Sequence, residues 1–137
     1  MNHKFNMEEV KYITGDLVRV EDSANWWTED GTIMKISAVN CTDMVDVLCG
    51  SENYTVDIDD IVPIPLTTKI LKLNGWYQDV ENKWVYPNDY PNADIRLEHN
   101  RDWLIWINNE NTLVYIKFAH ELQHLLFGFG LDHNLKV

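Results

Sequence analysis

The chain has 137 residues, 45% of them hydrophobic and 12% aromatic, which is enough apolar surface for one domain or two small packed modules. Its 22 acidic and 11 basic residues give a formal net charge of −11, which argues against nucleic-acid binding through a basic surface. No stretch approaches the roughly 20 apolar residues of a membrane span, and no signal-peptide pattern opens the chain, so we expect an intracellular protein without membrane contact.

The first half of the chain predicts a small antiparallel β-barrel of the SH3-like type. Apolar and polar residues alternate in short runs that are separated by polar turns, as in half-buried strands. These strands are expected at 17–20, 32–39, 44–48 and 54–58, with a shorter one at 62–65. The loop at 21–31 carries Trp26 and Trp27, which either cover the barrel end or form an exposed docking surface.

Pro63 and Pro65 mark the predicted boundary between two modules, residues 1–62 and residues 63–137. We expect the second module to contain a short helix, a four-stranded antiparallel meander and a terminal helix, and to pack against the first. The short helix is expected at 69–74 and the strands at 76–78, 83–86, 94–98 and 103–107. The predicted fold class is therefore α+β. The two modules form either two separate domains or one composite domain.

The longest segment with helical periodicity lies in the second module. Its apolar residues recur at i, i+3, i+4 and i+7, which predicts a helix over about 112–127. The apolar stripe consists of Tyr115, Phe118, Ala119, Leu122, Leu125, Leu126 and Phe129. His120 and His124 fall on the opposite face, so packing of the stripe on the meander would leave both imidazoles outward.

The run His120-Glu121-Leu122-Gln123-His124 matches the H-E-x-x-H pattern of zinc peptidases. Residues four apart share one face of a helix, so two imidazoles can bind one zinc ion. Between them, Glu121 would act as general base on a zinc-bound water. The pattern makes His120 and His124 candidate metal ligands and Glu121 a candidate catalytic residue.

The zinc interpretation lacks the third protein ligand that a catalytic zinc ion requires. Phe127 and Gly130 stand where the extended form of the motif has Gly and His, and no Glu follows Gly130. The alternative is a solvated polar face on which Lys117 and Glu121 form an i, i+4 pair worth only ~0.3–0.5 kcal/mol. We therefore predict no cofactor, with zinc as the alternative.

The chain has two cysteines, Cys41 and Cys49. An intracellular protein keeps both as free thiols. The alternative is a disulfide between them, which is geometrically feasible because they flank a predicted hairpin. Their spacing is not a metal-binding signature.

Two segments of the second module resemble a known group of proteins. They are Pro63-Ile64-Pro65-Leu66-Thr67 with Ile70-Leu71 and Asn74-Gly75-Trp76, and Tyr115 with His120-Glu121-Leu122-Gln123-His124-Leu125-Leu126. Both resemble a large group of small proteins, without established activity, that gut Bacteroidales and their phages and mobile elements encode. In this group the positions of Glu121 and His124 vary to residues that do not bind metal. The resemblance implies a phage or mobile-element setting in the bacterial cytoplasm, or in a virion, and no general dependence on zinc.

Three functions follow from these observations. We expect a non-enzymatic protein that binds another protein through an acidic, aromatic-bearing surface that includes Trp26 and Trp27. The alternatives are a zinc-dependent hydrolase built on His120, Glu121 and His124, and a structural component of a phage particle. The sequence leaves homo-oligomerisation open.

Overall fold

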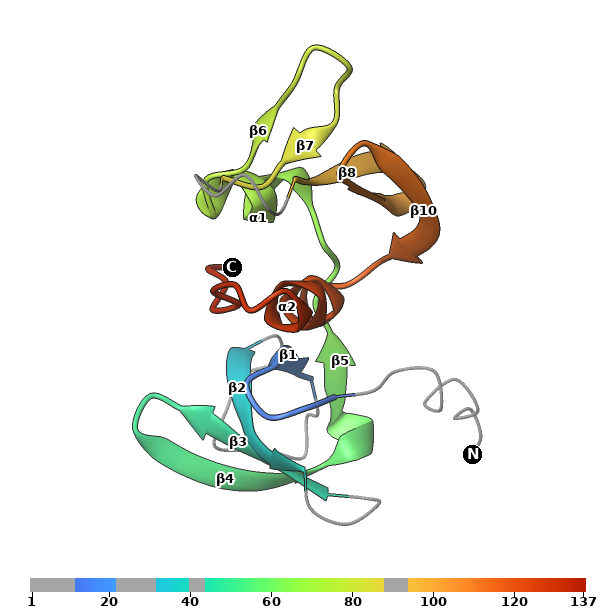
Figure 1. The fold of residues 1–137 in the computed structure, drawn as a ribbon. Coiled ribbons are helices and arrows are strands. Elements are labelled where there is room, and N and C mark those ends of the chain that lie inside the picture. Colours follow the sequence, from blue (N-terminus) through green and yellow to red (C-terminus); the bar gives the residue numbers. More distant parts are fainter. Residues whose placement is uncertain (1–11, 22–31, 40–43, 88–93) are drawn as a thin grey trace. The chain divides into compact units, whose positions relative to one another are not determined.

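The computed structural model describes residues 12–21, 32–39, 44–87 and 94–137. It confirms the α+β class, with antiparallel strands in two sheets and few helices (Figure 1). The chain divides into two compact units, Met1–Ile64 and Pro65–Val137. Among the described residues, no helix is both long and apolar enough to cross a membrane.

The first unit contains one five-stranded antiparallel sheet with the order β4-β3-β2-β1-β5. Its strands are β1 (Leu17–Val20), β2 (Thr32–Val39), β3 (Met44–Cys49), β4 (Glu52–Asp57) and β5 (Ile61–Pro63), with a 3-10 helix (Ile58–Asp60) before β5. The strands lie within two residues of their predicted positions. The sheet is open, because no pairing joins β4 to β5 in the described part of the chain, so the predicted barrel is not closed here.

One face of this sheet forms the core of the first unit. Side chains that alternate along each strand point to the same face, which is why Val18 and Val20 of β1 are both fully buried. The same alternation buries the other members of this core, Met34, Ile36, Val45, Val47, Val56 and Ile61. The period-2 pattern in the sequence therefore identifies the buried face correctly.

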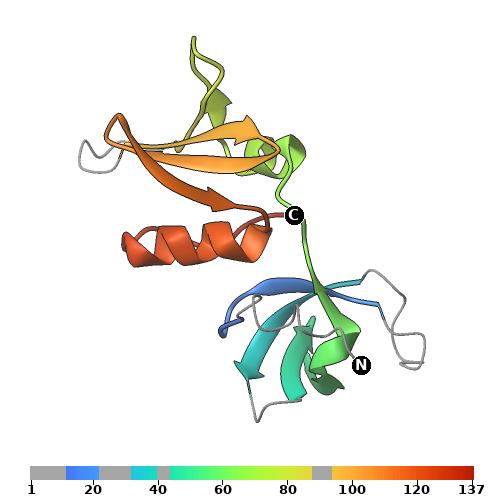
Figure 2. The same cartoon turned by 90° about the vertical axis from the view of Figure 1, so that its right-hand side faces the viewer.

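The second unit contains a five-stranded antiparallel meander with the order β10-β9-β8-β7-β6. Its elements are α1 (Thr68–Leu73), β6 (Tyr77–Gln78), β7 (Trp84–Val85), β8 (Ile95–Asn100), β9 (Asp102–Ile107), β10 (Glu110–Ile116) and α2 (Ala119–Gly128). Figure 2 shows α2 running along one side of this sheet. The Thr67 hydroxyl caps α1 by accepting a hydrogen bond from the Ile70 backbone N–H at 3.2 Å.

The predicted terminal helix was wrong at its start, because residues 110–116 form the fifth strand and α2 begins only at Ala119. Asn108 and Asn109 have φ angles of 49° and 70° and lie between the paired residues Ile107 and Glu110. Two consecutive residues with positive φ form the tight turn of a β-hairpin, for which Asn is well suited. Asn is also common at helix starts, but here the two asparagines form the turn that adds β10 to the sheet.

Candidate functional site

The H-E-x-x-H segment begins in the first turn of α2, where Glu121 stabilises the helix start. Its Oε1 accepts hydrogen bonds from the backbone N–H groups of Lys117 at 2.6 Å and Phe118 at 3.0 Å. Backbone N–H groups at a helix start lack partners within the helix, and the helix dipole favours a negative charge there. The motif position of the general base is thus occupied by a capping carboxylate.

The two histidines of the motif contact each other, and His120 is buried, contrary to the prediction. The rings of His120 and His124 meet edge to face with centroids 5.4 Å apart, and Phe118 stacks on His120 at 5.8 Å. His120 is only 2% exposed, so the prediction that both imidazoles face outward was wrong for His120. The buried part of α2 extends around the helix beyond the apolar stripe, because it includes His120 and Gln123 as well as Ala119, Leu122 and Leu126.

The other described histidines contact aromatic rings elsewhere in the second unit. His99 stacks on Trp103 with centroids 4.3 Å apart, and His133 meets the edge of Phe127 at 5.0 Å. Within the described ranges, no group of three or more His, Cys, Asp or Glu side chains is placed to hold one metal ion. The structure therefore brings His120 and His124 together without adding a third donor from the described residues.

Several residues singled out from the sequence are not placed by the structure. Trp26, Trp27 and Cys41 lie outside the described residues. Cys49 ends β3 as an exposed free thiol. The predicted docking loop therefore remains a sequence-based prediction.

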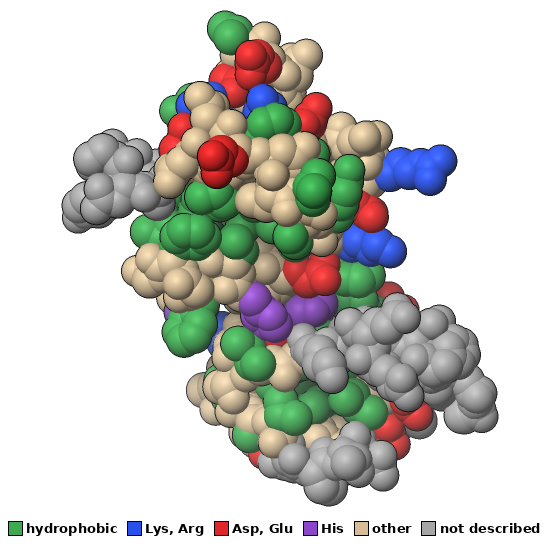
Figure 3. All heavy atoms as spheres, turned by 45° about the vertical axis from the view of Figure 1, so that its right-hand side comes forward, with side chains coloured by type: hydrophobic (Ala, Val, Ile, Leu, Met, Phe, Trp, Pro, Cys, Tyr) green, Lys and Arg blue, Asp and Glu red, His purple; other side chains and the backbone are tan. Residues whose placement is uncertain are grey.

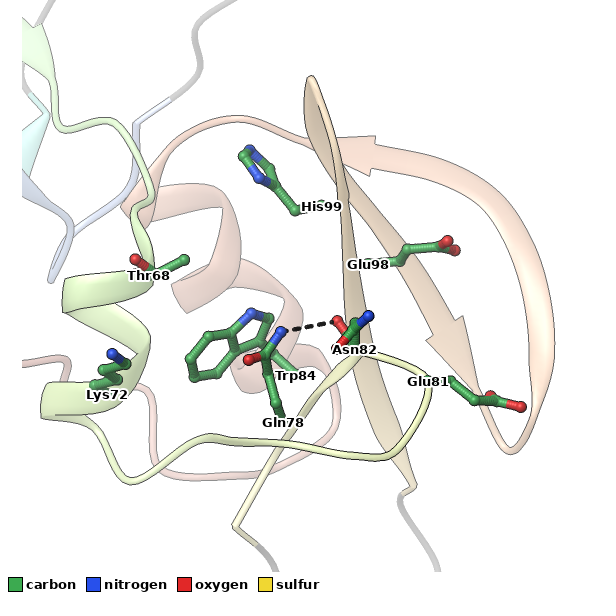
Figure 4. A pocket seen from close by; sticks show the side chains of 8 residues that line it. All are labelled: Thr68, Lys72, Gln78, Glu81, Asn82, Trp84, Glu98 and His99. Carbon is green, nitrogen blue, oxygen red and sulfur yellow. Dashed lines mark hydrogen bonds between the residues drawn. The ribbon is translucent and has the colours of Figure 1, made fainter.

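A polar groove of about 530 Å³ opens between α1, the β6–β7 hairpin and β8 (Figure 4). It is lined by Thr68, Lys72, Gln78, Glu81, Asn82, Trp84, Glu98 and His99. Much of this polar lining serves the fold itself. The amide of Gln78 donates to the Asn82 carbonyl at 3.3 Å, and Glu98 accepts from the Trp106 indole at 2.9 Å.

A bulge in the edge strand β10 is the feature that the sequence analysis missed. The register advances from Asn111 to Tyr115 on β10 while it advances only from Trp106 to Leu104 on β9, so β10 contains extra residues. At its centre Leu113 has a φ angle of 62°, in the left-handed region that non-glycine residues rarely adopt.

Side chains on either side of Leu113 hold this bulge in place. The Thr112 hydroxyl donates to the Ile105 carbonyl of β9 at 2.7 Å, and Asn111 Oδ1 accepts from the Leu113 backbone N–H at 2.8 Å. Thr112 also accepts from the backbone N–H of Val114 at 3.2 Å. Asn and Thr form such local bonds readily, so the pair Asn111-Thr112 is the signal in the sequence that points to a bulge.

The bulge presents apolar side chains to solvent at the edge of the sheet. Leu113 is 78% exposed, Val114 52% and Tyr115 49%. In Figure 3, hydrophobic and acidic side chains stand side by side on the visible face of the second unit. Contiguous exposed apolar side chains on an edge strand are a feature that proteins normally avoid unless a partner covers them.

Comparisons of the chain with protein-family models, with curated proteins and with solved structures found no match.

Proposed function

We propose that this protein is a non-enzymatic interaction protein that binds another protein through the exposed edge strand β10. The observation that carries the proposal is the bulge at Leu113, which holds three consecutive large apolar side chains in solvent. An edge strand offers unpaired backbone groups on its outer side, and a partner strand can add to it while neighbouring side chains supply specificity.

The energetics of Leu113 support a docking role. A left-handed backbone costs an L-residue roughly 1–2 kcal/mol, and the side chain of Leu113, which is 78% exposed, recovers little of this by burial. Burying a leucine side chain against a partner would contribute about 1.5–3 kcal/mol. Because local hydrogen bonds already hold the bulge, binding would not require the loop to be ordered first.

The charge of the chain supports a basic partner. A net charge of −11 repels acidic proteins and accelerates the approach of positively charged ones. The acidic surface would therefore select and orient the partner, while the apolar edge supplies the affinity. This division of roles is common in protein–protein interfaces.

The finer architecture and setting are part of the same proposal. An SH3-like arrangement of the first unit is supported by its strand order and by the 3-10 helix that precedes β5. In that arrangement, the loop carrying Trp26 and Trp27 would form a second docking element. The resemblance described above supports a phage or mobile-element setting in Bacteroidales, with a virion component as the alternative role.

The β10 proposal can be tested with Leu113→Gly. Glycine adopts the left-handed backbone without strain, so the free energy of unfolding of the variant should be about 1 kcal/mol higher than that of the wild type. The variant lacks the docking side chain. Proteins captured from host lysate by tagged wild type and variant would be compared by quantitative mass spectrometry. We expect the variant to retain about a tenth or less of the wild-type partner, as for a residue central to an interface.

Val80→Gly provides the matched control, because Val80 is fully exposed but belongs to the β6–β7 turn. It should capture the partner at the wild-type level. Equal capture by Leu113→Gly and wild type would overturn the β10 proposal. The predicted tryptophan loop is tested separately by changing Trp26 and Trp27 to Ala, with far-UV circular dichroism to establish that the variant is folded.

A further inference from the structure

Asn74 and Gly75 form the only Asn-Gly pair in the chain. In such a pair the backbone nitrogen of the glycine can attack the side-chain carbonyl carbon of the asparagine, because glycine has no Cβ to hinder the approach. A C–N bond forms, the C–N bond to the side-chain amide breaks, and the amide leaves as ammonia with the proton of the glycine N–H. Water then opens the cyclic imide to aspartate or isoaspartate, so a carboxylate replaces the amide.

The backbone of the folded protein keeps the two reacting groups apart. The ψ angle of Asn74 is 16°, which nearly eclipses the Gly75 nitrogen with the Asn74 nitrogen and turns it away from the Asn74 Cβ. The Gly75 N–H donates to the Lys72 carbonyl at 3.1 Å. Closure of the imide ring therefore requires a rotation about ψ and the loss of this hydrogen bond at the end of α1.

The side-chain amide of Asn74 is held by hydrogen bonds of its own. Its Nδ2 donates to the Ile70 carbonyl of α1 and to the Lys136 carbonyl, both at 2.8 Å. Its Oδ1 accepts from the Lys136 N–H at 2.9 Å. Lys136 belongs to the segment 131–137, which follows α2 in the same unit. The side chain of Asn74 can therefore rotate toward Gly75 only after its hydrogen bonds to this segment break.

A carboxylate at position 74 does not fit the place that the amide occupies. It would keep an acceptor for the Lys136 N–H, but the oxygen that replaces Nδ2 would face the carbonyl oxygens of Ile70 and Lys136 with no proton between them. Asn74 is also the C-cap of α1, where the helix dipole disfavours a negative charge. Deamidation would therefore weaken the contact between α1 and the segment 131–137.

We propose that Asn74 is a site of covalent modification by deamidation, and that residues 131–137 control its rate. The bound segment protects the amide, and detachment of the segment exposes it to attack by the Gly75 nitrogen. The carboxylate that forms opposes the return of the segment, so a reversible opening becomes a permanent one. The site lies at the end of α1, and the inference does not depend on the proposal for β10.

Lys136→Pro tests the control of the rate, because proline lacks the N–H that donates to Asn74 Oδ1. Full-length wild type and variant are incubated at mildly alkaline pH, and peptide mapping by mass spectrometry follows the conversion of Asn74. Deamidation is slow compared with local opening, so its rate depends on the population of the open state. We expect conversion about tenfold faster in the variant than in the folded wild type, and fastest in wild type unfolded with urea.

Lys136→Ala is the matched control, because the hydrogen bonds of Asn74 reach only the main chain of residue 136. It should convert at the wild-type rate. Far-UV circular dichroism establishes folding, and Leu135→Asp, which charges a half-buried side chain of the segment, replaces Lys136→Pro if that variant unfolds. Equal conversion in the wild type and the folded releasing variant would overturn the proposal, as would conversion of the folded wild type at the rate of the unfolded chain.

Asn74→Asp represents the product and tests the release of the segment. Hydrogen exchange of the Lys136 amide, followed by NMR at neutral pH, should be about tenfold faster than in the wild type, while the meander keeps its protection. Leu73→Asp places the same charge at an exposed position in the same helical turn and should leave the exchange of Lys136 unchanged. Wild-type exchange of the Lys136 amide in Asn74→Asp would overturn the release.

Discussion

At the scale of single residues, Glu121 shows how a motif can match a catalytic pattern and serve a structural role. Because α2 begins at Ala119, the Glu of the H-E-x-x-H pattern falls in the first helical turn, where a helix benefits from an acceptor. Here the carboxylate accepts the backbone N–H groups of Lys117 and Phe118. The i, i+4 side-chain pair with Lys117 that we considered from the sequence is replaced by a contact with its backbone.

Two alanine variants distinguish the cap from the side-chain pair. Glu121→Ala should lower the free energy of unfolding by about 1 kcal/mol, because it leaves two N–H groups at the helix start without their acceptor. Lys117→Ala should change it by less than about 0.5 kcal/mol, since only the backbone of Lys117 takes part. Urea unfolding followed by far-UV circular dichroism measures both. An equal loss of unfolding free energy in the two variants would show that the side-chain pair between Lys117 and Glu121 stabilises the helix start.

At the scale of an element, the β6–β7 hairpin depends on one carboxylate. Asp79 Oδ1 accepts the backbone N–H groups of Glu81 at 2.8 Å and Lys83 at 2.9 Å, which closes the turn. Its Oδ2 pairs with Arg96 of β8 at 2.6 Å, and Arg96 also pairs with Asp94 at 2.8 Å. The turn is thereby tied to the centre of the meander.

The charge state of Asp79 gives the hairpin a pH dependence. Burial alone would raise the pKa of this carboxyl, but hydrogen bonds from the Lys83 backbone and from Arg96 outweigh it, and the net pKa is lowered. A carboxyl whose pKa is lowered by folding stabilises the fold above its unfolded pKa of about 3.9, and this contribution is lost as the pH falls through the lower, folded value.

Asp79→Asn should therefore be less stable than the wild type at neutral pH by roughly 1 kcal/mol or less, a value reduced because Arg96 is partly exposed. As the pH falls below about 4, the two proteins should converge, because the wild-type carboxyl also becomes neutral. Thermal unfolding between pH 7 and pH 2.5 measures the difference. A difference that stays constant over this range would contradict the assignment.

At the scale of the whole molecule, each unit buries its own apolar side chains. Among the described residues, the buried side chains of the first unit's core cluster, from Val18 to Ile61, belong to the strands of that unit. In the second unit, Leu71 of α1, Leu97 of β8 and Leu122 of α2 are each fully buried. A chain of 137 residues thus divides its apolar surface between two small cores, which limits the stability that either can supply.

Cavity-forming variants should reveal this division. Ile36→Ala and Leu97→Ala should each cost about 2–5 kcal/mol of unfolding free energy in the unit that contains them. Amide hydrogen exchange should increase across the strands of the first unit for Ile36→Ala, and across the meander for Leu97→Ala. Equal increases in both units for either variant would show that the chain unfolds as one cooperative body.

Much of the strand pattern was predictable because it depends on neighbours in the sequence. Alternating residues such as Val18 and Val20 define a buried face without reference to any other strand. The turn at Gly75, with a φ angle of 84°, is also local, since glycine adopts this conformation without strain. The sequence by itself therefore determined the α+β class and the positions of the strands up to β9.

The tertiary structure alone decided the features that depend on residues far apart in the sequence. Residues 112–116 satisfy a helical pattern, and pairing with β9 makes them a strand with a bulge. Residues far apart in the sequence, Asn74 and Lys136, meet in a two-bond contact that no local pattern encodes. The physical reason is the same in both cases: hydrogen bonds between distant segments override weak local preferences once the sheet and helices bring their partners together.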